Sequence, residues 1–172
     1  MNAASLRRAV DEIERHVAEG GWNQPPRLYA LAPTDDLVRR EPRLAGGLGI
    51  DPEDPPADTL TPVEQQIPDR PLEDLLPTIE WPNTVVGCAL AVERIVLPPA
   101  AEESMPDDAD AVNDWAQQHP GRTDVRIVVG VLRDGTRTSV LRVRGHDADT
   151  DLIRDPEFSP DLGDVLAETL AD

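Results

Sequence analysis

Residues 81–99 read WPNTVVGCALAVERIVLPP and form the longest apolar run of the chain. The run is rich in β-branched residues, and Pro82, Pro98 and Pro99 bound it, which favours a strand over a helix. Strand alternation separates a face of Val86, Cys88, Leu90 and Val92 from a face of Val85, Gly87, Ala89 and Ala91. Because the second face is small, we expect a helix or another strand to approach it closely.

Two further runs, DVRIVVGVL at 124–132 and RTSVLRVR at 137–144, are joined through Asp134 and Gly135. Strand-like runs connected by Asp-Gly predict a β-hairpin. A two-residue turn would pair Val131 with Thr138 and Val129 with Val140. That register predicts one row of Val125, Ile127, Val129 and Val131, with Arg142 and Arg144 on the same face further from the turn, and an opposite row of Val128, Leu132, Leu141 and Val143. Since both faces carry apolar rows, we expect helices to cover them.

The two ends of the chain predict helices. The first carries an apolar stripe of Leu6, Val10, Ile13 and Val17 and ends at Gly20 and Gly21. The last begins at Ser159, Pro160 and Asp161 and presents Leu162, Val165, Leu166 and Leu170.

Shorter elements are predicted between these ends: a strand at 27–31, helical turns at 34–40 and 72–76, and a helix from 106 to 119. Prolines recur from Pro52 to Pro82 and forbid a long helix or a central strand there, and 51–58 has the composition of a disordered segment.

We therefore expect residues 1–172 to form a single α+β domain with a proline-rich excursion at about 46–82. It would contain an N-terminal helix, a mainly antiparallel sheet of about four or five strands and a C-terminal helix. This outline loosely resembles that of secretion-chaperone-like sandwiches.

Composition excludes several functions. The net charge of −18 and a pI of about 4.3 repel nucleic acid and anionic membranes, and 3% aromatic residues offer little stacking surface for RNA. All 16 basic residues are arginine, which removes Schiff-base chemistry and the P-loop lysine. The lone Cys88 cannot form a disulfide within the chain, and no signal-peptide pattern opens it, so we expect a cytoplasmic protein.

Several short segments carry a resemblance to a known family: Trp81-Pro82, Gly87-Cys88-Ala89, Glu93-Arg94, Leu97-Pro98-Pro99, His119-Pro120, Gly130 to Gly135, and His146-Asp147. Together they resemble an actinobacterial family of short acidic conserved hypothetical proteins, named after a propionibacterial locus. The resemblance spans nearly the whole chain and implies an actinobacterial, intracellular protein. It brings no activity, cofactor or site residue with it.

No catalytic, cofactor-binding or metal-binding residue is predicted. Cys88 lies mid-strand among apolar neighbours and is expected to be a buried core residue. The string HDADTD at 146–151 starts like an EF-hand loop, but Leu152 and Phe158 stand where that loop needs Gly and Glu, so we expect a solvated acidic loop. His16 and His119 fall at predicted helix ends and have structural interpretations.

The charged residues within the predicted sheet allow two hypotheses. Glu93 could form a structural pair with an arginine, or Arg126, Arg142 and Arg144 could form a patch that binds an anion. Trp81, next to the proline-rich segment, could lie on a protein partner or could plug the sheet edge of its own chain.

The leading hypothesis is a non-enzymatic adaptor or chaperone-like interaction domain that binds one or more proteins, with homodimer formation left open. The alternatives are a small enzyme or sensor of an anionic ligand, and an acidic regulator that mimics DNA.

Overall fold

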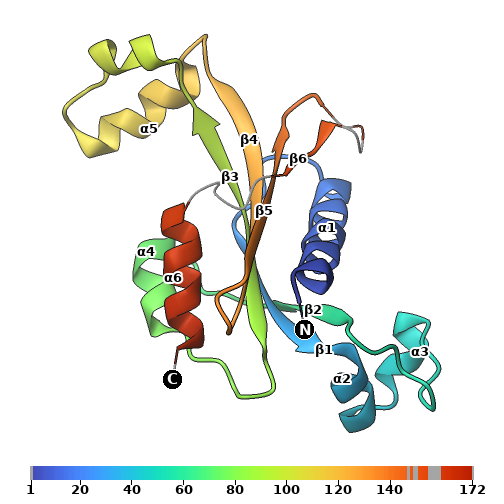
Figure 1. Cartoon of the computed structure of the whole chain (residues 1–172). Coiled ribbons are helices and arrows are strands. Elements are labelled where there is room, and N and C mark those ends of the chain that lie inside the picture. The colour runs from blue at the N-terminus through green and yellow to red at the C-terminus, as the bar shows by residue number, and fades with distance from the viewer. Residues whose placement is uncertain (1, 147, 149–150, 155–159, 172) are drawn as a thin grey trace.

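The computed structural model describes residues 2–146, 148, 151–154 and 160–171. Within them lies an antiparallel six-stranded sheet in the order β2-β1-β3-β4-β5-β6 (Figure 1). The strands are β1 (Arg27–Pro33), β2 (Leu60–Gln65), β3 (Gly87–Val96), β4 (Thr123–Leu132), β5 (Arg137–Val143) and β6 (Ile153–Arg154). The α+β class is confirmed. The sheet is larger than predicted, because β2 and the two-residue β6 lie in segments without a strand-like pattern.

Helices cover both faces of the sheet (Figure 1). Helix α1 (Ala3–Glu19) packs on one face, and α6 (Pro160–Leu170) lies with α4 (Leu72–Leu75) on the other. The remaining elements are α2 (Thr34–Arg40), α3 (Leu44–Leu48), η1 (Leu76–Thr78), η2 (Pro99–Ser104) and α5 (Ala109–Gln118). Both termini of the described chain therefore belong to helices that pack against the sheet.

The predicted stripe of α1 is confirmed, since Leu6, Val10, Ile13 and Val17 are all buried. Asn2 caps the helix by accepting a hydrogen bond from the Ser5 amide. The small face of β3 lets α1 approach as expected, because Ala89 and Ala91 pack in its cluster. Gly130 pairs with Ala89, and a Cβ added there would lie 2.6 Å from Val10 Cγ2. The sheet surface beneath α1 thus tolerates no larger residue at this position.

The opposite face packs Cys88, Leu90 and Val92 against Leu166 and Leu170 of α6. The prediction for the residues just before β3 was wrong. Val85 belongs to this α6-side cluster and Val86 packs on the α1 side. Strand alternation does not reach them, because β3 begins only at Gly87.

The predicted hairpin exists, but its register was wrong by one residue. Val131 pairs with Arg137 and Val129 with Ser139, because the loop has three residues, Arg133, Asp134 and Gly135. Gly135 N donates to Leu132 O, Leu132 N donates to Thr136 O, and Gly135 has a φ of +93°. This is a type I turn closed by a left-handed glycine, in place of a two-residue turn.

A slip of one residue exchanges the two faces of a strand. Arg142 and Val140 therefore share the α1 face with Arg126 and Val128, whereas Leu141 and Val143 pack on the α6 side. The predicted rows, which put Arg142 with Val129 and Leu141 with Val128, were wrong for this reason.

The proline-rich segment contributes structure to both faces. It forms the edge strand β2, in which Pro62 is tolerated, and then α4 and η1, close to the helical turn expected at 72–76. Residues 51–58 follow a series of bends and turns between α3 and β2. Helix α6 starts at Pro160 as predicted, while its expected cap, Ser159, lies outside the described residues.

Candidate functional site

Three of the predicted site residues form one row across the sheet. Glu93 of β3 pairs with Arg126 of β4, and Arg126 pairs with Arg142 of β5. Directly paired residues share a face, so all three side chains lie on the α1 side. Arg126 and Arg142 are 1% and 4% exposed, which makes this row an ionic cluster within the core.

Arg142 is neutralised by a carboxylate from α1. Its Nε and Nη2 both donate to Glu14, the Nη2–Oε2 distance being 3.1 Å, and Glu14 is as deeply buried as its partner. Arg142 Nη1 donates to His146 O at 2.8 Å and to Ala148 O at 3.1 Å. A fork-to-fork pair of this kind is geometrically specific, and it fixes the rotation of α1 on the sheet.

Arg126 binds the turn that follows α1. Its Nη2 donates to Gly21 O and lies 3.9 Å from Glu93 Oε2. The Trp22 ring covers the guanidinium, with Cζ 4.5 Å from the ring centroid. Burial lowers the pKa of Arg126, and the carboxylates of Glu93 and Glu14 act in the opposite direction. Within the described chain, the Nε of Arg126 is buried without a hydrogen-bond partner.

Arg144 lies at the rim of the cluster. Its Nη1 is 3.3 Å from Asp124 Oδ2 and 3.4 Å from Asn23 Oδ1, and its Cζ lies 5.7 Å from the Trp22 ring centroid. Arg142 and Arg126 line a cavity of about 420 Å³, whereas Arg144 lines a separate one of about 340 Å³. The three arginines therefore do not converge on one concave site.

Glu93 completes the attachment of the turn by accepting hydrogen bonds from the amides of Asn23 and Gln24, at 2.8 and 2.9 Å.

Glu14 and Trp22 are the members of this cluster that the sequence interpretation missed. A signal for Glu14 was present, because position 14 lies four residues after Val10 and three before Val17, on the buried stripe. An acid on such a stripe calls for a buried basic partner.

Trp81 packs on its own chain. Its Nε1 donates to Thr169 Oγ1 of α6 at 2.9 Å, and the half-buried ring contacts the α6-side core. Arg133 fixes the backbone around it, donating from Nε to Val85 O at 2.7 Å and from Nη2 to Trp81 O at 3.3 Å. Trp81 thus joins the end of the proline-rich segment to α6.

Beside this contact, α4, η1 and α6 enclose a groove of about 460 Å³. Its apolar walls come from Leu72, Leu76 and Pro77 on one side and from Leu162 and Val165 on the other. Glu73, Asp161 and Glu168 line it, and Arg94 is the one basic residue among the described residues of its lining. Leu72, Leu162 and Val165 remain half-exposed, so the groove presents apolar surface within an acidic frame.

Nothing in the described residues gathers three potential metal ligands among His, Cys, Asp and Glu. Asp147, Asp149 and Thr150 of the acidic loop lie outside these residues. Cys88 is fully buried, as expected for a core residue, and burial raises the pKa of its thiol to about 11. Of the helices that the structure describes, none has the length and apolar character needed to cross a bilayer.

A small antiparallel sheet with helices on both faces and a buried arginine–carboxylate row thus defines an α+β domain. The chain belongs to the PPA1309-like protein family, which it matches over residues 6–171. No curated protein and no solved structure matches it.

Proposed function

We propose that this chain is a non-enzymatic adaptor that binds a basic amphipathic helix of a partner protein in the groove between α4 and α6. The observation that carries the proposal is the combination of apolar walls with a carboxylate frame, formed by Glu73, Asp161 and Glu168. Helix-in-groove recognition places apolar anchors at i, i+3 and i+4 into a cleft, and flanking charges select the partner.

The buried cluster supports this assignment indirectly. The carboxylate of Glu14 already occupies Arg142, and Asp124 lies against Arg144, so two of the predicted patch residues are compensated within the chain. Trp81 does not line the groove. It supports one wall of the groove indirectly, because its Nε1 donates a hydrogen bond to Thr169 of α6. The free thiol of Cys88 and the family resemblance favour the cytoplasm of an actinobacterial cell as the setting.

A direct binding experiment tests the adaptor function. The probe is a fluorescent peptide with leucines at i, i+3, i+4 and i+7 and arginines between them, and the measurement is fluorescence anisotropy. A scrambled peptide of the same composition controls for attraction to the charge of −18. We expect the amphipathic peptide to bind more tightly, and Leu162→Asp to weaken its binding by about tenfold, since a charge then enters the apolar wall.

Leu44→Asp is the matched control, because Leu44 is a 43% exposed leucine of α3 that does not line the groove. Both variants are first checked for native circular dichroism and melting temperature. Equal binding of the two peptides, or equal effects of the two substitutions, would reject the groove as the docking site.

One specific observation favours the anion-sensor hypothesis: Arg126 Nε has no hydrogen-bond partner among the described residues and lies beside a cavity that Arg15 also lines. Arg15 is exposed, so Arg15→Gln leaves the Glu14–Arg142 pair intact. If this hypothesis holds, citrate should raise the melting temperature of the wild type but not of this variant. The DNA-mimic hypothesis rests on the net charge alone.

A further inference from the structure

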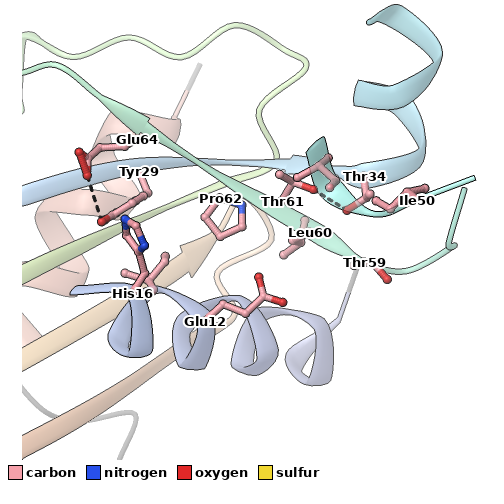
Figure 2. Close-up of a pocket in the computed structure, with 12 residues that line it drawn as sticks. Glu12, His16, Tyr29, Thr34, Ile50, Thr59, Leu60, Thr61, Pro62 and Glu64 are labelled. Atoms are coloured by element: carbon pink, nitrogen blue, oxygen red, sulfur yellow. Dashed lines mark hydrogen bonds between the residues drawn. The ribbon is translucent and has the colours of Figure 1, made fainter. Parts of the chain in front are cut away.

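A further concavity lies on the α1 face of the sheet, between α1 and the edge strand β2. It has a volume of about 400 Å³, within the range of small-molecule sites. Ile13 of α1, Tyr29 of β1 and Leu60 of β2 are buried residues that line it. Figure 2 shows Glu12 and His16 projecting from α1 toward β2 across this space.

The register of the sheet explains why the pocket is open here. Tyr29 pairs with Glu64 and Leu31 with Pro62, so β2 continues the α1 face of the sheet out to its edge. The end of the pocket away from His16 comes from the segment between β1 and β2 and includes Thr34, Ile50 and Thr59 (Figure 2). Thr34 Oγ1 and Thr61 Oγ1 lie 2.8 Å apart and hydrogen-bond to each other.

Of the two carboxylates that line this pocket within the described part of the chain, one is already compensated. Glu64 forms an ion pair with Arg27 and accepts a hydrogen bond from Tyr29 Oη at 3.2 Å (Figure 2). Arg27 Nη2 also lies 3.3 Å from His16 Nε2. The charge of Glu64 is therefore already compensated by Arg27, and its carboxylate is engaged by the Tyr29 hydroxyl.

Glu12 differs from Glu64. It is exposed at the edge of the pocket beside Ile13 and Leu60, and it makes no hydrogen bond and no ion pair with any residue that the structure describes. Partial desolvation raises its pKa, and the charges of Arg15 and Arg8 act in the opposite direction. A carboxylate in this setting gains most from a cation that arrives together with apolar surface.

We propose that this pocket binds a small organic amine with an apolar body, whose ammonium group pairs with Glu12. Its body lies against the accessible apolar lining of Leu48, Ile50 and Pro62, above a floor that includes the buried Tyr29. Arginine is absent from the described residues that line the pocket, so the lining does not favour an anion. The predominantly apolar walls disfavour a divalent cation, which needs several oxygen ligands. This site lies on the face opposite to the proposed docking groove, and the two can fail independently.

The experiment uses phenethylamine as the probe and 2-phenylethanol as its neutral isostere. Tyr29 is the only tyrosine of the chain, so its ring signals in an NMR titration report directly on the pocket. We expect saturable shifts with the amine at lower concentration than with the alcohol. In Glu12→Gln, the amine should bind about tenfold more weakly and the alcohol with unchanged affinity, because only the charged hydrogen bond is removed.

Two further variants complete the test. Leu48→Ala removes an exposed side chain of the pocket wall and should weaken amine and alcohol alike. Glu73→Gln, in the groove on the opposite face, should change neither. Equal affinities of amine and alcohol, an unchanged amine affinity in Glu12→Gln, or no saturable shift of the Tyr29 signals would overturn the proposal.

Discussion

Glu14 of α1 and Arg142 of β5 form a buried, doubly hydrogen-bonded ion pair across 128 residues of sequence. The pair joins the first helix to the fifth strand within the core. Burying two charges costs solvation free energy, which their attraction offsets only when the geometry is good and the remaining donors are satisfied; here both Nε and Nη2 of Arg142 donate to Glu14.

Glu14→Ala should lower the free energy of unfolding by about 3–5 kcal/mol, because it leaves the buried guanidinium of Arg142 without its carboxylate. Urea denaturation measures this loss. Glu19→Ala is the matched control on the same helix, since its side chain is 81% exposed, and it should cost less than about 0.5 kcal/mol. The double variant Glu14→Leu/Arg142→Met should recover most of the stability. A cost below about 1 kcal/mol for Glu14→Ala would contradict the pairing.

Cys88 should react slowly with thiol reagents in the folded protein. Burial raises the pKa of its thiol to about 11 from an ordinary 9.0, so at pH 8 the thiolate is about a hundredfold scarcer than in urea. The same shift has a consequence for stability. A raised pKa stabilises the fold fully below pH 9, and this contribution is lost as the pH rises toward 11. Labelling followed by mass spectrometry measures the rates, and equal native and denatured rates would show that Cys88 is accessible.

Tyr29 should ionise late. Burial raises the pKa of its phenol to about 12; the charge of Arg27 lowers this pKa and the carboxylate of Glu64 raises it. An absorbance titration of the single tyrosine should therefore show a midpoint near 12 in the native state and near 10 in urea. The stabilisation is complete below pH 10 and is lost between pH 10 and 12. Glu64→Gln should lower the native midpoint and Arg27→Gln should raise it; the reverse order would disprove the assigned contacts.

Pro62 should protect the open edge of the sheet. Thr34 N donates to Thr59 O, and the alternation of an antiparallel ladder then turns the backbone nitrogen of Pro62 toward the free side of β2. A proline there removes the central donor that a further strand would use. In analytical ultracentrifugation, the weight-average mass of Pro62→Thr should therefore rise as the protein concentration rises. Val63→Thr, at the next position, is the control and should leave the mass unchanged.

Local patterns accounted for much of the architecture. The stripe from Leu6 to Val17 is sufficient to predict α1, because helical periodicity is a property of neighbouring residues. The run around Cys88 predicts β3 for the same reason, with its periodicity of two. The short helices at 34–40 and 72–75 follow from their prolines and acidic first turns. What the site contains was harder to predict, because its members come from distant segments.

The hairpin between β4 and β5 has one feature that its local sequence determines and another that depends on tertiary contacts. Asp134 and Gly135 by themselves determine that the chain turns, since both residue types favour turns. They do not determine whether the loop has two residues or three, and the difference exchanges the faces of β5. Packing decides that choice, because the observed register brings Arg142 onto Glu14 and Val140 under α1. The same holds for the partners of β2, the row from Glu93 to Arg142, the groove between α4 and α6 and the pocket beside α1. Each depends on contacts between segments distant in sequence, which only the folded chain brings together.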